Sequence, residues 1–540
     1  MFKVNSYIHL IGYFCFGIAL LIAIDPGWSI WLGSLQYDLH EGENILPRLL
    51  VLLCSSVIVL LPFLGARRYW LLVYSLLLFP LCLLGYSFVL IQGQFTFWEV
   101  SIVINEWGLG ADALSAFLPQ VAMATGITLA VIVAIWVLRP RLTETQMPLS
   151  GQLLGSRRFQ AALFLPWLLP TAYLLLAGGG YWINHFALPL KVPASLAFSL
   201  SHPVYVGPRN AVVLEAPATK PVNLIFIVDE SVRGDFLGIN NIDENTTPFL
   251  EAWQAHSPYE NFGVVNSVSN CSAPSNLLLR TGADPEQAAL SGELALKTAN
   301  IFQYARHSGL RTVYLDAQVT PDRLQNYFTQ AEISQLDQFV ALQDQHNVEH
   351  HQLDHQLARD IIQQIKQQDQ PLFIYANKIG AHFPYEATYP PEMQKTTTDK
   401  LNHYRQALRW NVDTFFKILL PRLKELKEPT LIVYTSDHGQ GLGEHGNNST
   451  HCLPTAVPAE QAKVPLLLFS LNTDAAQQYQ LQPGQYSQFQ VFSSLLNMMG
   501  YPSGKVRELF GQDLSQPWQG PRYFYSGDLV GNGQLSKNVF

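Results

Sequence analysis

The stretch "VNLIFIVDE" (residues 222–230) decides the fold class, because a short and mostly apolar run leads directly into two acidic residues. A run that is continuous, with no alternation of polar and apolar residues, is typical of a strand buried on both faces. Four further runs have the same character, namely "RTVYLDA" (311–317), "PLFIYAN" (371–377), "TLIVYTS" (430–436) and "VPLLLFS" (464–470). These runs predict a sheet that is covered by helices on both sides.

Stretches with a helical pattern lie between the apolar runs, as at residues 354–366 and 401–417. Strands that alternate with helices predict an α/β domain with a mainly parallel sheet, here over residues 221–540. In such sheets the ligand site lies beyond the carboxyl ends of the strands.

The first 181 residues carry the long apolar runs of a chain that is 48% hydrophobic and only 14% charged. A membrane-spanning helix needs about 20 apolar residues, and five runs meet this length, at residues 7–24, 46–64, 70–92, 114–138 and 159–181. We therefore expect an α-helical membrane domain with five transmembrane helices at residues 1–181, rather than buried core helices or a cleaved signal peptide.

The loops between the expected spans set the orientation. Basic residues gather before the first span and in alternate loops, for example at Arg67 and Arg68. The positive-inside rule then places the N-terminus in the cytoplasm and everything after the fifth span outside. Residues 182–220 contain several prolines and predict a linker with an interfacial helix. The net charge of −8, with no basic cluster, argues against a nucleic-acid partner.

Metal-type side chains follow three of the expected strands. Asp229 and Glu230 come after the first, His382 soon after the third, and Asp437 and His438 after the fourth. Carboxylates together with imidazole suit Zn²⁺ better than Ca²⁺ or Mg²⁺. We expect Glu230, Asp437 and His438 to bind a metal ion, with the hydroxyl of Ser272 as a fourth ligand.

Ser272 lies in "NCSAPSNLLLRTG" (270–282), which reads as the start of a helix. The N-terminus of a helix favours an anion such as a phosphate, and a metal makes a bound hydroxyl easier to ionise. Ser272 is thus a candidate nucleophile, and the alternative is a simple N-cap. His382 and His451 are candidates for holding a phosphate, donating a proton or binding a second metal, and His445 is a further candidate.

Five segments together resemble the membrane phosphoethanolamine transferases of the alkaline phosphatase/sulfatase superfamily. They are "NLIFIVDESVRGD" (223–235), the Ser272 stretch, "GAHFPYEATYPPE" (380–392), "YTSDHGQGLGEHG" (434–446) and "HCLPTAVPAEQAKVP" (451–465). By position, the resemblance implies that Glu230, Asp437 and His438 are zinc ligands. It likewise implies that Ser272 is the nucleophile and that His382 and His451 contact the transferred phosphate.

The resemblance also implies a reaction and a location. Phosphoethanolamine would pass from phosphatidylethanolamine through a covalent phospho-Ser272 intermediate to an envelope acceptor, either lipid A or lipopolysaccharide or another glycan. The site would bind either one or two Zn²⁺ ions, of which one is bound tightly. The protein would lie in the bacterial inner membrane, with its catalytic domain in the periplasm. Lys463 and His445 would bind substrate, and Asn105 and Glu106 would meet the donor headgroup, unless their loop is an ordinary interfacial one.

Three departures from the family pattern shape these expectations. A serine stands where the lipid A enzymes usually have threonine, and only Cys271 and Cys452 lie in the exported part. Since each of these cysteines neighbours a residue expected at the same phosphate, we predict a Cys271–Cys452 disulfide. Asn276 replaces the arginine of the sulfatase signature and argues against a formylglycine enzyme. The alternatives are a phosphoglycerol transferase, a membrane-anchored sulfatase or phosphodiesterase, and a non-catalytic scaffold.

Overall fold

The computed structural model divides into two compact units, Met1–Pro203 and Val204–Phe540. It describes residues 18–26, 28, 51–56, 68–92, 95, 117–138, 183, 186–201, 208–218, 221–284, 286, 292–319, 325–345, 348–394, 399–444, 450–453, 457–473, 481–527 and 534–537.

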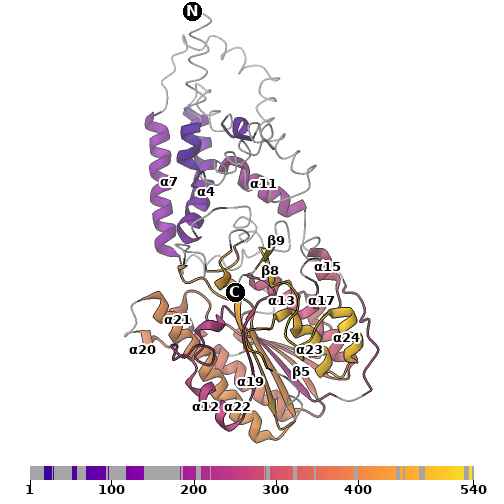
Figure 1. Ribbon diagram of the computed structural model, residues 1–540. Helices are drawn as coiled ribbons and strands as arrows, with labels where there is room; N and C mark the ends of the chain where they lie inside the picture. Colours follow the sequence, from indigo (N-terminus) through magenta and orange to yellow (C-terminus); the bar gives the residue numbers. More distant parts are fainter. Residues whose placement is uncertain are drawn as a thin grey trace, which may run out of the picture. The chain divides into compact units, whose positions relative to one another are not determined.

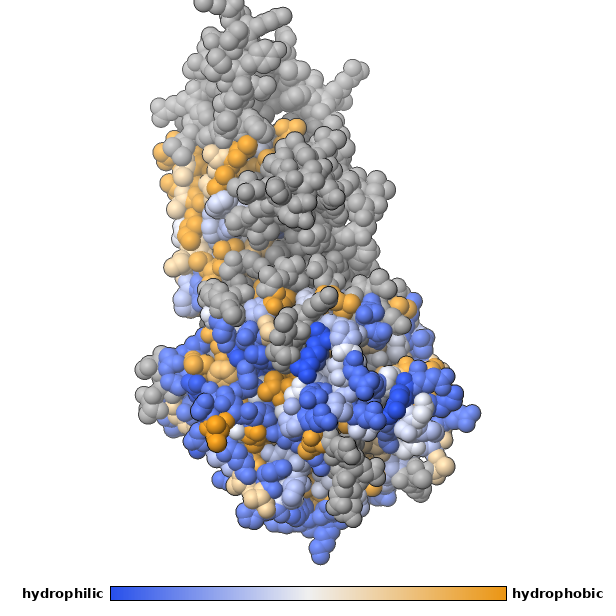
Figure 2. Space-filling model, in the orientation of Figure 1, coloured by the Kyte–Doolittle hydropathy of each residue, from blue (hydrophilic) through white to orange (hydrophobic). Residues whose placement is uncertain are grey.

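The first unit is helical where it is described. Its helices are α4 (Arg68–Gln92), α7 (Leu118–Leu138) and α11 (Leu188–Ser201). The indole of Trp136 on α7 donates to Ser75 Oγ on α4 over 2.9 Å. Among the described residues, the segment Leu118–Val137 is long and apolar enough to cross a membrane, and the apolar segment Tyr74–Leu90 is shorter. Much of the visible surface of α4 and α7 is apolar (Figure 2).

The five expected spans are therefore described only in part. The third and fourth coincide with α4 and α7. Of the first and second, residues 18–24 and 51–56 are described and helical, and the fifth lies outside the described residues. Within the expected linker, α11 forms the helix that the sequence suggests there. The count of five spans stays a prediction.

The second unit is built on a seven-stranded sheet with strand order β2-β7-β6-β1-β5-β3-β4. The strands are β1 (Asn223–Asp229), β2 (Glu260–Asn266), β3 (Arg311–Asp316), β4 (Gln338–Ala341), β5 (Leu372–Asn377), β6 (Thr430–Ser436) and β7 (Lys463–Leu471). Strands β6, β1, β5, β3 and β4 are parallel, whereas β7 runs antiparallel to both of its neighbours. A separate hairpin joins β8 (Tyr523–Ser526) and β9 (Gln534–Lys537).

Helices cover both faces of this sheet, and alternate strand residues supply two hydrophobic cores. On β1, Phe226 points into one core and Ile225 and Ile227 into the other. The first core is closed by α13 (Ser272–Thr281), α15 (Gly292–Lys297), α16 (Ile301–His307), α23 (Val491–Met498) and α24 (Ser503–Phe510). The second is closed by α12 (Pro248–His256), α19 (Leu353–Gln367), α21 (Lys400–Leu408) and α22 (Phe415–Leu426) (Figure 1). Short helices α17 (Gln330–Ile333), α18 (Leu342–Gln345) and α20 (Pro391–Gln394) complete the unit.

The predicted α/β class and its mainly parallel sheet are confirmed. One predicted helix differs, because residues 401–417 do not form a single α-helix. A π-helical turn, Arg409–Thr414, separates α21 from α22 there. π-Helical turns are rare in proteins, and many of those that do occur lie at functional sites.

Candidate active site

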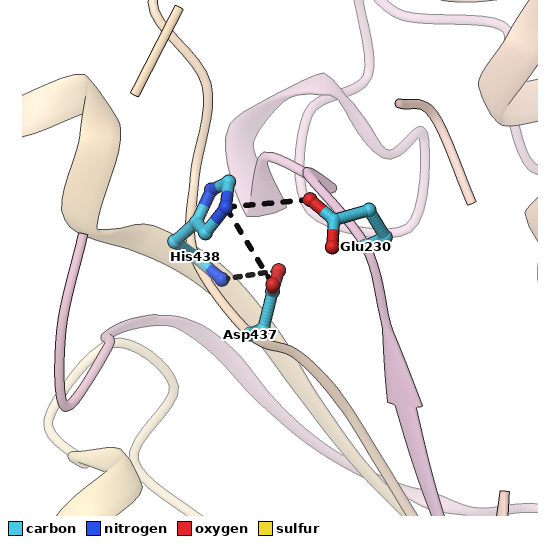
Figure 3. Close-up of side chains that lie close together, drawn as sticks. All are labelled: Glu230, Asp437 and His438. Carbon is cyan, nitrogen blue, oxygen red and sulfur yellow. Dashed lines mark hydrogen bonds and ion pairs between the residues drawn. The ribbon is translucent and has the colours of Figure 1, made fainter. Parts of the chain in front are cut away.

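Three side chains from two adjacent strands converge at the carboxyl edge of the sheet. Glu230 directly follows β1, and Asp437 and His438 directly follow β6. One ligand atom from each lies within 4.8 Å of the others. His438 Nε2 is 3.3 Å from Glu230 Oε1 and 3.5 Å from Asp437 Oδ2 (Figure 3). The register of β1 against β6 pairs Asp229 with Ser436, which brings the next residues of both strands together.

Ser272 points into this cluster from the start of helix α13. Its Oγ lies 3.0 Å from His438 Nε2 and 3.4 Å from Glu230 Oε1. The N-cap position of α13 is occupied by Cys271, so Ser272 is the first helical residue. The helix N-terminus contributes partial positive charge at this hydroxyl. Ser272 therefore faces the carboxylate–imidazole cluster instead of capping its own helix.

The charges of the cluster are strongly coupled. Burial alone would raise the pKa of Glu230, but the hydrogen bond and charge of His438 hold it below its usual range. Burial alone would lower the pKa of His438, but the charge of Asp437 and the bond to Glu230 raise it to about 9. Burial and the nearby Glu230 raise the pKa of Asp437 well above its usual range. Two acidic groups and one imidazole thus share a small buried space, in which a cation would favour the ionised form of both acids.

The donor set fits a metal ion. Asp437 Oδ1 accepts from the backbone amides of Ser231 and His438, over 3.1 and 2.7 Å. Its Oδ2 is buried and accepts no hydrogen bond from any residue that the structure describes. His438 Nδ1 lies 2.6 Å from the carbonyl of Gly439, which leaves Nε2 facing the cluster. A buried carboxylate oxygen without a donor is costly alone, and it is the atom that a bound cation would use.

Two more histidines lie near the cluster. The ring of His451 stacks on the ring of His438, with centroids 4.3 Å apart. Burial and the positive charges of His438 and His382 hold the pKa of His451 well below its usual range. His382 is exposed, and its charge also lowers the pKa of Glu230. Both histidines thus lie within electrostatic reach of Glu230, and His451 favours its neutral form.

The remaining predicted site residues are Lys463, whose substrate-binding role stays a prediction, and three residues that are not described. Lys463 Nζ forms ion pairs with Asp235 Oδ2 at 3.5 Å and with Glu460 Oε1 at 3.6 Å. His445, Asn105 and Glu106 lie outside the described residues, so their roles stay predictions.

A disulfide joins the nucleophile helix to the segment that carries His451. Cys271 and Cys452 are bonded, with Cα atoms 4.5 Å apart and a separation of 181 positions in sequence. Asn270 reinforces this junction, because its carbonyl accepts from the Cys452 amide over 2.8 Å and its side-chain amide donates to Leu453 O over 2.8 Å. The bond and these hydrogen bonds therefore join the two segments directly beside Ser272 and His451.

Replacing Cys271 and Cys452 together by serine should lower the free energy of unfolding by about 2–5 kcal/mol, because the bridge closes a very long loop. Denaturant unfolding of the full chain measures this. Reducing agent should destabilise the wild type by a similar amount and leave the double variant unchanged. A double variant as stable as the wild type would show that the bridge contributes nothing to the fold.

Several residues that hold the cluster were missed from the sequence. Ser231 Oγ donates to Glu230 Oε1 over 2.8 Å, and Gln318 Nε2 donates to Glu230 Oε2 over 3.3 Å. Lys378 is fully buried and bonds to Asp229. Gln318 and Lys378 follow β3 and β5, so the rule that strand ends carry the site could have found both.

The family model described as Sulfatase matches residues 222–501 of this chain. Among curated relatives, phosphoethanolamine transferase EptA of Escherichia coli K12 is 35% identical over 153 residues, which is 24% of this chain and 27% of the relative. The Kdo(2)-lipid A phosphoethanolamine 7''-transferase of the same strain is 22% identical over 53% of this chain and 51% of its own length. The matched region thus spans from about a quarter to half of these relatives.

Solved structures share the fold. The integral membrane lipooligosaccharide phosphoethanolamine transferase A of Neisseria meningitidis aligns with a TM-score of 0.58 and 16% identity, covering 92% of this chain and 96% of its own. The zinc complex of the periplasmic domain of EptC from Escherichia coli aligns with a TM-score of 0.52 and 16% identity, covering 61% of this chain and 97% of that domain. The resemblance inferred from the sequence motifs is confirmed by these relatives.

Proposed function

Since the chain belongs to the sulfatase family, we propose that it transfers phosphoethanolamine from phosphatidylethanolamine to an acceptor in the bacterial envelope. The observation that carries this proposal is the position of Ser272 Oγ, 3.0 Å from His438 Nε2 and 3.4 Å from Glu230 Oε1 at the start of a helix. A hydroxyl beside a metal-type cluster and a helix N-terminus is suited to attack phosphorus.

Glu230, Asp437 and His438 would hold a zinc ion, with Ser272 beside it. The ion would supply positive charge that favours the ionised serine and stabilises charge developing on the phosphoryl oxygens. The Oδ2 atom of Asp437 supports this assignment, because it is buried and accepts no hydrogen bond from the described residues. The zinc complex of EptC, among the structures that share the fold, supports it as well. We assign His382 and His451 to a second cation or to the phosphate itself, and the stacking of His451 on His438 supports this for His451.

The reaction would proceed in two displacements. Ser272 Oγ, which is half-buried, would release its proton to solvent and attack the donor phosphorus, and the bond from phosphorus to the glycerol oxygen would break. The departing diacylglycerol oxygen would take up a proton, for which we assign the exposed His382 as donor. An acceptor hydroxyl would then attack the phosphorus of phospho-Ser272, and the serine oxygen would leave and take up a proton from solvent. The neutral His451 is suited to accept the proton of the attacking hydroxyl.

The proposal includes the place of the protein in the membrane. Residues 1–181 would form five spans, residues 182–220 the linker, and residues 221–540 the periplasmic catalytic domain. The apolar helix Leu118–Val137 supports a membrane location, and the Cys271–Cys452 bond is the kind expected in an oxidising compartment. The relatives named for lipid A and lipooligosaccharide support an acceptor of that class.

The experiment that tests the proposal uses the full chain in detergent, loaded with zinc, and donor lipids labelled in the acyl chain. Labelled phosphatidylethanolamine should yield labelled diacylglycerol, and mass analysis should find phosphoethanolamine on the peptide that contains Ser272. Labelled phosphatidylglycerol is the matched control donor.

Three results would contradict the proposal in different ways. Diacylglycerol from phosphatidylglycerol alone would make the protein a phosphoglycerol transferase. Release without a covalent adduct on Ser272 would favour a phosphodiesterase. Cleavage of a sulfate ester with neither lipid consumed would favour a sulfatase, against which Asn276 at the signature position already argues.

A further inference from the structure

A buried charged cluster lies behind the candidate metal ligands and takes no direct part in the proposed chemistry. It consists of Lys378, Asp229 and Asp354, which are all buried to within 1% of full burial. Lys378 Nζ bonds to Asp229 Oδ2 and lies 3.7 Å from Asp354 Oδ2. Burying three charges is expensive and is tolerated only where each is well paired. Such a cluster beside an active site therefore needs a reason.

Asp229 touches both strands that carry the metal-type side chains. Its Oδ1 accepts from the backbone amide of Glu230 over 3.0 Å. Its carbonyl accepts from the amide of Asp437 over 2.8 Å. Its Oδ2 accepts from Lys378 and, over 2.9 Å, from Tyr434. Both carboxylate oxygens of Asp229 thus accept hydrogen bonds from other groups.

Lys378 also fixes the segment that leads to His382. Its ammonium donates to the carbonyl of Asn411 in the π-helical turn and lies 4.4 Å from the ring centre of Phe415. The side chain of Asn411 in turn donates to Gly380 O over 2.8 Å. The amide of Ala381, next to His382, donates to Glu230 O over 3.0 Å.

The backbone at Gly380 packs closely against Asp229 and Glu230. Gly380 has φ +58°, and a Cβ atom there would collide with Asp229 Oδ1 and with the backbone of Glu230. Asp354 Oδ1 and Oδ2 accept from the amides of Ile379 and Gly380, over 2.8 and 3.0 Å. A shift of Lys378 or Asp229 would therefore move Glu230 and the His382 segment together.

We propose that Lys378 is a positioning residue, whose ammonium anchors Asp229 so that Glu230 and His382 are held in the geometry that metal binding and phosphoryl transfer require. This inference rests on the proposed function. Groups that orient metal ligands from behind typically contribute about 10- to 100-fold to metal affinity or activity. Lys378 would act on Glu230 through Asp229, without touching the ion or the substrate.

The test compares Lys378→Met with the double variant Asp229→Asn/Lys378→Met in the full chain. Met has a similar length and no charge, and Asn keeps an oxygen that can accept from the Glu230 amide. Both variants leave Asp354 with its two backbone amide donors and without a cation. The single variant also leaves the Asp229 carboxylate without a cation, whereas the double variant removes the charges of Lys378 and Asp229 together. For each variant we measure the zinc retained after dialysis against a chelator and the melting temperature with chelator present. We also measure kcat and KM for diacylglycerol release. Lys505→Met, which removes an exposed lysine, is the control.

We expect the single variant to melt at a lower temperature, to retain zinc about 10- to 100-fold less tightly, and to lose kcat by a similar factor at unchanged KM. The double variant should recover most of the melting temperature but not the zinc retention or kcat, because an amide at residue 229 is no longer anchored. If Lys378→Met does not fold, the zinc retention and kcat of the double variant, compared with those of the wild type, test the inference.

Recovery of melting temperature, zinc retention and kcat together in the double variant would overturn the inference, because Lys378 would then only balance a buried charge. Wild-type zinc retention in the single variant would overturn it as well. A wild-type protein that retains no zinc would overturn the proposed function and this inference with it.

Discussion

Replacing Ser272 by alanine is expected to lower diacylglycerol release by about 10³-fold or more, because the covalent route through Oγ is lost with the hydroxyl. The side chain is half-buried, and its Oγ contacts only Glu230 and His438 among the described residues. Thermal melting should therefore change little. The measurement is release of labelled diacylglycerol from phosphatidylethanolamine, together with mass analysis of the Ser272 peptide, from which the adduct should disappear.

Two matched variants sharpen this test. Ser272→Thr keeps a hydroxyl at the same position and should retain transfer, since threonine has the same chemistry. Ser275→Ala removes the hydroxyl three residues further along α13, which donates to Asp437 O over 2.6 Å and also lies 3.2 Å from Ser269 O. It should reduce stability while leaving the adduct on Ser272. Full activity of Ser272→Ala would exclude the covalent mechanism.

The inner strands of the sheet could be predicted from the sequence, and its edges could not. The run at residues 222–228 differs from β1 by a single residue at each end, because a strand covered on both faces needs a continuous apolar run. The edge strands β2 and β4 have one neighbour each. Strand β2 reads "ENFGVVN" and is only partly buried, and β4 has four residues. Neither shows the apolar run on which the prediction depends.

The antiparallel direction of β7 was likewise not predicted from the sequence. The run at residues 464–470 has the same composition as its parallel neighbours, yet β7 is antiparallel to β6 and β2. The direction of a strand is set by its connection to the neighbouring strand. The apolar pattern of the strand is the same in either direction. The π-helical turn after Leu408 is a similar case. Its backbone carbonyl at Asn411 meets Lys378, a contact that depends on tertiary packing.

The candidate site was predictable to the extent that strand ends converge. Glu230, Asp437 and His438 could be grouped because parallel strands end at one edge, and the structure brings them within 4.8 Å. The residues that orient them are ordinary polar residues in sequence. Ser231 and Gln318 acquire a role only through contacts with Glu230. The nucleophile stretch left a cap and a catalytic residue as alternatives, and the distinction required knowing that Cys271 takes the N-cap position.

Replacing Asp437 by asparagine should abolish zinc binding while preserving the metal-free fold. The amide oxygen can still accept from the Ser231 and His438 backbone amides, as Oδ1 does now over 3.1 and 2.7 Å. The amide nitrogen takes the place of Oδ2, the buried oxygen that has no hydrogen-bond donor, and a nitrogen with two protons is no metal ligand. The measurement is the melting temperature of the wild type and of the variant at increasing concentrations of zinc.

The wild type should gain melting temperature when zinc is added, since a ligand that binds only the folded state stabilises it. Asp437→Asn should show no such gain, and its diacylglycerol release should fall to the level of Ser272→Ala. Without zinc the variant should melt no lower than the wild type, because the substitution removes one of two buried carboxylates that repel each other. Asp413→Asn is the matched control, because Asp413 accepts from two backbone amides at the start of α12, each over 3.1 Å. That variant should lose stability and keep the zinc response. A zinc response in Asp437→Asn equal to that of the wild type would place the metal elsewhere.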